Sequence, residues 1–171
     1  KGGINYSDKV TTVSKTYAKE IKTPDYGEGL DGLLQYRGMF LEGIVNGIDY
    51  KEYNPNTDKY IYINYDIETI DNKKLNKEEL QKELNLPIDK EIPMIGLVSR
   101  LTHQKGCDLI VRILGELLKE DIQVVIVGTG DYIYEESFKS FNVRYPEKIS
   151  TSIRFSNELA HKVYAAADMF L

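Results

Sequence analysis

The sequence predicts an α/β protein built on a parallel sheet with helices on both faces. From Pro93 onward, short apolar segments alternate with segments of helical periodicity, which is typical of such a sheet. The apolar segments are continuous and do not alternate with polar residues, as expected of strands buried on both faces. The composition, with 42% hydrophobic and 29% charged residues among 171, is that of a globular protein.

Two short segments with strand propensity lie in the first part of the chain. Residues 10–13 (VTTV) favour a strand, and Ser14 is placed to cap a short helix that ends at Ile21. The apolar run 40–45 favours a second strand, and Asn46-Gly47 directly after it predicts a turn.

The later part of the chain alternates regularly. Asn76, followed by Glu79 three residues later, predicts a helix start, and Ser156 predicts another. In chain order, we expect a helix from Asn76 ended by Leu86-Pro87, a strand at 93–99, a helix at 109–118, a strand at 122–128, a helix or irregular segment at 134–145, a strand at 148–155, a helix from Ser156 and a last strand from Asp168.

These elements divide the chain into three parts. Residues 1–45 form the end of an amino-terminal domain, residues 46–70 cross between two bodies, and residues 71–171 form the first part of a second domain. The chain begins with Lys1 and ends in the apolar run "MFL", which is typical of a strand interior. We therefore expect it to be a piece of a longer protein.

Charge and composition exclude several function classes. The net charge of −5 and the pI near 5.2 argue against non-specific binding to nucleic acid or to an anionic membrane. A single cysteine, Cys107, excludes an internal disulfide and a site of several thiolates, and two histidines limit metal binding further. No apolar run approaches the roughly 20 residues that a membrane helix needs.

Two cations follow the first predicted strand of the parallel sheet. Arg100 and Lys105 lie in the segment "SRLTHQKG", where a strand end would expose them beside Gly106. A guanidinium and an ammonium close together can clamp a diphosphate, the first through its planar fork and the second as a point charge. The alternative is that both are solvated surface charges.

The next two strand ends offer groups that suit a nucleotide. Gly128–Asp131 follow the second strand, where two glycines let a backbone approach a ligand and present N–H groups to an anion. The alternative is an ordinary tight turn. Phe155 ends the third strand, where it would either stack on a base or pack in the core.

Other reactive side chains lack a catalytic pattern. His103 lies in the cationic loop and would be exposed or a minor contact, whereas a packing or surface role is expected for His161 inside the last helix. Cys107 begins a helix, which would favour its thiolate, but we expect a buried structural thiol.

Five strings in chain order carry a resemblance to a known family. They are "VTTVSKTYAKEI", "GEGLDGLL", "GIVNGIDYKEYNP", "LVSRL" and "SRLTHQKGCDLI". Each string alone is modest, but the five in this order are specific. On them, and over essentially its whole length, the chain resembles the bacterial glycogen synthases of the ADP-glucose type and the plant starch synthases.

The resemblance implies a retaining, cytoplasmic glucosyltransferase with two Rossmann-like domains on either side of a cleft. Such an enzyme moves glucose from ADP-glucose to the non-reducing end of an α-1,4-glucan. Its partners are therefore a nucleotide sugar and a glucan acceptor, without nucleic acid, membrane or metal, and without a cofactor beyond ADP-glucose as substrate and ADP as product. The first part of the chain would belong to the acceptor-side domain.

The resemblance also implies roles for single residues. Arg100 and Lys105 would be catalytic, gripping the donor diphosphate and stabilising the departing ADP. The remaining implied contacts are Gly128, Thr129 and Gly130 in the nucleotide pocket, Phe155 stacked on adenine and Asn46 near the donor sugar.

Departures from the family pattern leave alternatives open. Lys15 stands where the family has proline, and Arg154 replaces a glycine beside the stacking aromatic. The family's Lys-x-Gly-Gly loop, catalytic histidine region and later pair of glutamates are not in this chain, so we expect it to be inactive alone. The alternatives are another retaining glycosyltransferase that uses a UDP-sugar, and a non-catalytic nucleotide- or glucan-binding module.

Overall fold

The protein forms two compact units. A computed structural model describes all of residues 1–171, and their contacts divide into a first unit, Lys1–Asp49, and a second unit, Tyr50–Leu171. The predicted crossing segment 46–70 thus contains residues of both units. No helix in either unit is long and apolar enough to cross a bilayer.

The first unit is built around two parallel strands. Its elements, in chain order, are α1 (Gly2–Tyr6), β1 (Val10–Val13), α2 (Tyr17–Glu20), α3 (Asp31–Tyr36) and β2 (Leu41–Ile44). Both predicted strands are confirmed, and they pair in parallel. Ser14 Oγ accepts hydrogen bonds from the N–H groups of Thr16 at 3.2 Å and Tyr17 at 3.3 Å, as a capping side chain does.

The turn predicted at Asn46-Gly47 is absent. Residues 45–49 have no regular structure and no turn. An Asn-Gly turn joins two antiparallel strands, but β2 pairs in parallel with β1 and no strand follows it in this unit. The Asn46-Gly47 dipeptide, which is typical of a hairpin turn, therefore lies in no hairpin.

The second unit is a four-stranded parallel sheet with helices between its strands. Its elements are α4 (Asn72–Glu83), β3 (Met94–Val98), the short 3₁₀ helix η1 (His103–Lys105), α5 (Cys107–Leu117), β4 (Gln123–Val127), α6 (Tyr132–Arg144), β5 (Ile149–Ser152), α7 (Asn157–Ala166) and β6 (Met169–Phe170). The four predicted strands are confirmed, and the segment at 134–145 is a helix. The parallel α/β fold class is therefore correct.

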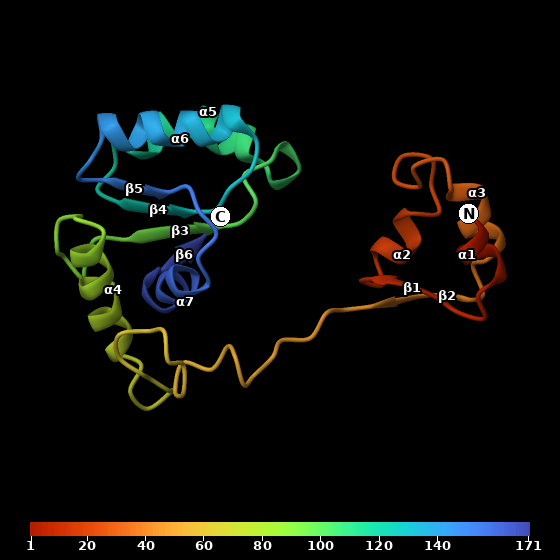
Figure 1. Ribbon diagram of the computed structural model, residues 1–171, viewed down its shortest axis with the longest axis horizontal. Helices are drawn as coiled ribbons and strands as arrows, with labels where there is room; N and C mark the ends of the chain where they lie inside the picture. The colour runs from red at the N-terminus through yellow and green to blue at the C-terminus, as the bar shows by residue number, and fades with distance from the viewer. The chain divides into compact units, whose positions relative to one another are not determined.

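Helices cover both faces of this sheet, as Figure 1 shows with α5 and α6 on one side and α4 and α7 on the other. Successive residues of β4 point to opposite sides because side chains alternate along a strand. Val124 and Ile126 join the core under α5 and α6, whereas Val125 and Val127 join the core against α4 and α7. This double burial explains why the strand sequence is apolar without alternation.

The predicted cap Asn76 lies inside a helix. Helix α4 begins at Asn72, one turn earlier than expected, and Asn76 is fully buried. Its amide oxygen accepts from the N–H groups of Tyr62 and Ile63, and its amide nitrogen donates to the Ile63 carbonyl at 2.7 Å. The side chain thus fastens the irregular segment before α4 to the helix, a long-range task that resembles a cap signal in sequence.

The order of the strands indicates at which edge of the sheet a ligand would bind. The sheet has the order β5-β4-β3-β6, so the chain adds strands in one direction and then returns to the other side of β3. Ligands of open parallel sheets bind beyond the carboxyl ends of the strands, near the point where the order reverses. The loops after β3, β4 and β5 all leave the sheet at that edge.

Candidate nucleotide site

One pocket joins the ends of three neighbouring strands. Its cavity of about 310 Å³ lies at the carboxyl edge of the sheet in the second unit. The lining comes from the end of β3 (Val98, Ser99, Arg100), the end of β4 (Val127, Gly128, Thr129), the loop after β5 (Arg154, Phe155, Ser156), helix α7 (Asn157, Ala160, Tyr164) and the segment before α4 (Tyr53). Four of the predicted site residues therefore meet in one place.

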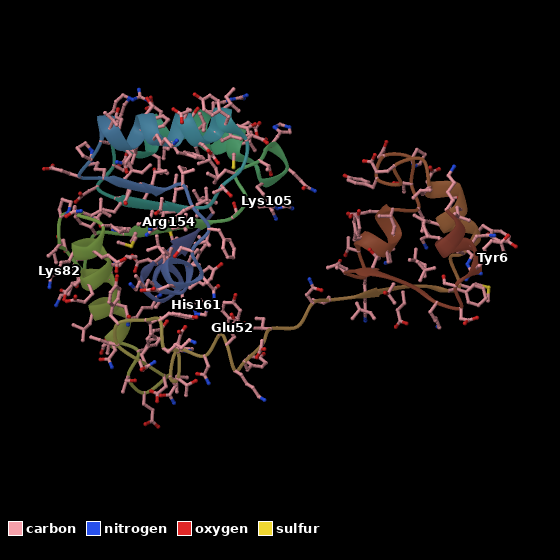
Figure 2. The ribbon with its side chains drawn as sticks, viewed as in Figure 1. Tyr6, Glu52, Lys82, Lys105, Arg154 and His161 are labelled. Atoms are coloured by element: carbon pink, nitrogen blue, oxygen red, sulfur yellow. The ribbon has the colours of Figure 1, made fainter.

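Both predicted cations lie on the loop after β3, but only one of them lines the pocket. Arg100 is exposed and lines the cavity, and Lys105 is exposed at the end of η1 (Figure 2). The ion pair of this loop joins His103 Nδ1 and Asp108 Oδ1 at 3.2 Å and involves neither cation. Arg100 and Lys105 thus keep their charges for a ligand.

The glycine turn after β4 serves a different purpose from the predicted one. A Cβ on Gly128 would lie 1.9 Å from the Ser99 carbonyl oxygen, and a Cβ on Gly130 would lie 2.1 Å from that of Leu101. The missing side chains therefore let the loops after β3 and β4 pack backbone to backbone, where Leu101 donates to Thr129 O at 2.9 Å.

Contacts with β5 and α6 use most of the amide groups in the turn. The Gly128 N–H donates to the Ser152 carbonyl at 3.1 Å, and the Gly130 N–H donates to Glu135 Oε1 at 2.8 Å. The expectation that the glycines present their N–H groups to an anion is therefore wrong. Between them, the N–H of Thr129 has no hydrogen-bond partner in the chain and remains for a ligand.

Phe155 faces outward in the loop after β5. Its side chain is 90% exposed while it lines the pocket, so the alternative that it packs in the core is wrong. Helix α7 begins directly after it, and Ser156 caps the helix as predicted by accepting from the Leu159 N–H at 3.2 Å. The cap holds the turn that presents the aromatic ring.

Sequence reasoning missed several pocket residues, among them Tyr53, Asn157, Ala160 and Tyr164. Asn157, Ala160 and Tyr164 follow each other at spacings of three and four, the helical repeat that places residues on one face, so this face of α7 was available as a signal. Burial raises the pKa of Tyr164, and the nearby Tyr53 adds to the effect. Tyr53 gave no local signal, because it lies in an irregular segment far from the strands in sequence.

The histidines and the cysteine have structural surroundings. His103 is exposed, whereas the His161 side chain is 1% exposed and packs as expected. Cys107 is fully buried, and burial raises the pKa of its thiol, so the predicted structural role fits. No group of three or more potential ligand side chains could hold a metal ion. Asn46 belongs to the first unit, and its role near the donor sugar stays a prediction.

Comparisons with known proteins support the resemblance seen in the motifs. The family described as the starch synthase catalytic domain matches residues 1–36. Over all 171 residues, the chain is 61% identical to a glycogen synthase of Clostridium perfringens and 54% identical to one of Thermotoga maritima. The chain covers 36% and 35% of these relatives, so it spans about a third of their length.

A solved structure agrees with the fold over the same extent. The catalytic domain of starch synthase IV from Arabidopsis thaliana, bound to ADP and acarbose, matches 99% of this chain with a TM-score of 0.92 and 31% identity, and the match covers 35% of that domain's chain. The family resemblance is thereby confirmed: along its whole length the chain is similar in sequence to the glycogen synthases and in fold to part of a starch synthase catalytic domain.

Proposed function

We propose that the chain is part of a glucosyltransferase of the glycogen synthase type and that its pocket binds the ADP moiety of ADP-glucose. The observation that carries the proposal is the pocket itself, in which an unpaired Arg100 and an exposed Phe155 line one cavity at the carboxyl edge of a parallel sheet. The relatives named glycogen synthase support the reaction, and the similar starch synthase is described as bound to ADP.

The pocket divides naturally into two ends. The Phe155 ring offers a flat apolar face to a base, and stacking on an aromatic contributes about 1–3 kcal/mol per base. Arg100 and the free N–H of Thr129 leave neighbouring strands and would bind diphosphate oxygens, with Lys105 adding charge from the same loop. The length of a nucleoside diphosphate would connect these two ends.

The same cations would act in the reaction. When glucose is transferred, the bond between its anomeric carbon and the diphosphate oxygen breaks, and the electron pair leaves with ADP. A bond to a hydroxyl oxygen of the glucan forms, and that hydroxyl loses its proton. Arg100 and Lys105 would stabilise the negative charge that develops on the departing ADP, an interaction stronger in the transition state than in the ground state.

A second candidate donor is favoured by one residue. Arg154 lines the pocket next to Phe155, and a guanidinium has hydrogen-bond donors but no acceptor. Adenine presents both a donor and an acceptor along its amino edge, whereas uracil presents carbonyl acceptors. A UDP-sugar therefore remains the alternative donor.

Calorimetry on the chain tests the proposal. We expect ADP to bind in the micromolar range, and Arg100→Ala to weaken binding about 10- to 100-fold because a charge-assisted contact is lost. Arg112→Ala, an exposed arginine on α5 outside the pocket, is the matched control and should bind ADP normally.

Three outcomes would contradict the proposal. They are an absence of ADP binding, equal binding by the wild-type chain and Arg100→Ala, and binding of maltooligosaccharides without any nucleotide. The last would favour a glucan-binding module. Tighter binding of UDP than of ADP would favour the alternative donor.

A further inference from the structure

A buried acid–base pair lies behind the pocket. His161 Nδ1, on α7, is 2.5 Å from Asp58 Oδ2, and the two side chains are 1% and 7% exposed. The other carboxylate oxygen of Asp58 accepts the Tyr60 N–H at 2.8 Å. This pair connects α7 with a segment 103 positions earlier in the chain.

The pair is in contact with the pocket through one aromatic ring. Tyr53 stacks on the His161 imidazole, with ring centroids 4.8 Å apart and an angle of 11° between the planes. Tyr53 also lines the pocket, and Tyr164 meets its ring edge-on at 6.3 Å. Asp58, His161 and Tyr53 thus form a continuous series from the interior of the unit to the pocket wall.

Tyr53 needs such support because its own segment has no regular structure. Residues 50–65 form turns and bends without a helix or strand, so no ladder of backbone hydrogen bonds fixes the direction of the ring. What fixes it is side-chain contact with α7, mainly the stack on His161. Figure 2 shows His161 on α7, close to the segment that carries Glu52.

The imidazole has a hydrogen bond on one side only. His161 Nε2 is buried without a hydrogen-bond partner, so Asp58 is the one polar partner that orients the ring, which the rings of Tyr60 and Tyr164 also meet edge-on at 5.1 Å and 6.5 Å. A small cavity of about 100 Å³ borders Tyr53, Asp58, His161 and Tyr164, and leaves room for these rings to shift. Without Asp58 the imidazole would lose the contact that keeps it parallel to Tyr53.

We propose that Asp58 and His161 are positioning residues of the nucleotide pocket, which hold Tyr53 as one of its walls. The proposal rests on the proposed function, because it assumes that the pocket binds ADP. Neither residue touches the ligand. Both act through the tyrosine ring, whose flat face is the surface that they keep in place.

A double-mutant cycle on ADP binding tests the proposal. We expect Tyr53→Ala and His161→Ala each to weaken ADP binding about five-fold, a loss typical of one aromatic contact, and the double variant to lose no more than either single variant. Arg100→Ala should add its own loss to either variant, because Arg100 lies on the loop after β3 and is not part of the Asp58, His161 and Tyr53 series. A general structural defect would not give this pattern.

Two further variants separate positioning from stability. His161→Phe keeps a flat ring against Tyr53 but leaves Oδ2 of the buried Asp58 carboxylate without its imidazole partner. We expect it to melt at a lower temperature and to bind ADP more tightly than His161→Ala, because a ring again packs on Tyr53, but less tightly than the wild-type chain, because Asp58 no longer helps to set the plane of that ring. Asp58→Asn keeps an acceptor for the Tyr60 N–H and should fall between the wild-type chain and His161→Ala in ADP affinity.

The outcomes distinguish this proposal from the proposed function. If Arg100→Ala weakens ADP binding but Tyr53→Ala and His161→Ala do not, the positioning claim is wrong and the function stands. If the wild-type chain binds no ADP, the function is wrong. The ring resonances of Tyr53, from isotope-labelled tyrosine, then decide the positioning claim: a shift in His161→Ala supports it, and unchanged resonances overturn it.

Discussion

The loop after β3 and the turn after β4 end neighbouring strands of one sheet, yet they leave different groups for a ligand. Arg100 and Lys105 of the first loop have no ion-pair partner in the chain. The amide groups of Gly128 and Gly130 in the second turn are already bonded to Ser152 and Glu135. Both segments suggested phosphate binding in sequence, and only the first retains most of the groups needed for it.

The difference shows that the glycines after β4 serve the packing of the two loops. The two glycines are required by the neighbouring loop, whose carbonyl oxygens occupy the space that a Cβ would need. A cation on an exposed loop is not needed for packing within the chain, so its charge stays available for a ligand. Whether a group serves the fold or a ligand therefore depends on the partners that it already has.

The largest expected effect is on folding, from Gly130→Ala. The new Cβ would lie 2.1 Å from the Leu101 carbonyl oxygen, so the two loops must separate. We expect the free energy of unfolding, measured by urea denaturation, to fall by about 3 kcal/mol, the upper range for inserting a methyl group into a packed site.

Gly115→Ala is the matched control for this substitution. Gly115 lies inside α5, where a Cβ would meet the Phe141 ring at an ordinary 3.6 Å. Alanine is favoured over glycine in a helix by about 1 kcal/mol, so this variant should be as stable as the wild-type chain or more so. If Gly130→Ala unfolded at the same urea concentration as Gly115→Ala, the glycines would not be there for loop packing.

A smaller effect is expected on ligand affinity from Lys105→Ala. Lys105 lies on the loop but does not line the cavity, so it would act on a diphosphate through solvent. We expect ADP binding to weaken about three-fold at low salt and the loss to disappear near 1 M salt, where screening is strong. Lys105→Arg keeps the charge and should behave as the wild-type chain.

Calorimetry at two salt concentrations checks this prediction. The loss caused by Arg100→Ala should persist at high salt, because Arg100 lines the pocket and its contact is direct. An equally persistent loss in Lys105→Ala would mean that Lys105 contacts the diphosphate directly, and the two cations would then not differ.

The sequence predicted those parts of the site that depend on residues close together in the chain. Uninterrupted apolar runs located β3 and β4, because strands buried on both faces need apolar residues along their length. Once strands are located, their ends follow, and so do Arg100 and Phe155. The Ser156 cap was also predictable, since a cap bonds within its own first turn.

The parts that sequence could not predict depend on distant contacts. Asn76 is an acceptor for residues 62–63 and not a cap, a role that appears only when the two segments are brought together. Tyr53 becomes a pocket wall through His161, more than a hundred positions away. The use of the Gly128 N–H group likewise depends on Ser152, at the end of another strand.

The preference of the pocket for ADP over UDP tests whether Arg154 is available to a ligand, and the variant is Arg154→Gly. Arg154 lines the pocket, and its guanidinium can only donate hydrogen bonds. Removing it should weaken binding of UDP more than that of ADP, so that the preference for ADP rises about three-fold, a change smaller than that of one full bidentate base contact. Competition calorimetry with the two nucleotides measures the ratio. An unchanged ratio would show that Arg154 does not face the base.

The smallest expected effect comes from a cation that is already paired. Lys162 Nζ lies 2.8 Å from Glu83 Oε2, and Tyr62 donates its hydroxyl to the same carboxylate at 2.5 Å. Burial raises the pKa of Glu83, but the hydrogen bonds from Lys162 and Tyr62 outweigh it, so the pKa lies below its ordinary value of 4.5. A carboxyl group with a lowered pKa stabilises the folded state above that ordinary value and loses this contribution as the pH falls through its folded pKa.

We therefore expect Glu83→Gln to lower the free energy of unfolding by less than about 1 kcal/mol at neutral pH, because the Glu83 side chain is 37% exposed and solvent screens its ion pair. The difference from the wild-type chain should shrink as the pH is lowered below 4.5, where the native carboxylate also becomes protonated. Urea denaturation at a series of pH values measures it. A difference that grew toward acid pH would mean that the pair with Glu83 does not stabilise the fold, although Lys162 would still have a partner in Glu158 Oε1 at 2.7 Å.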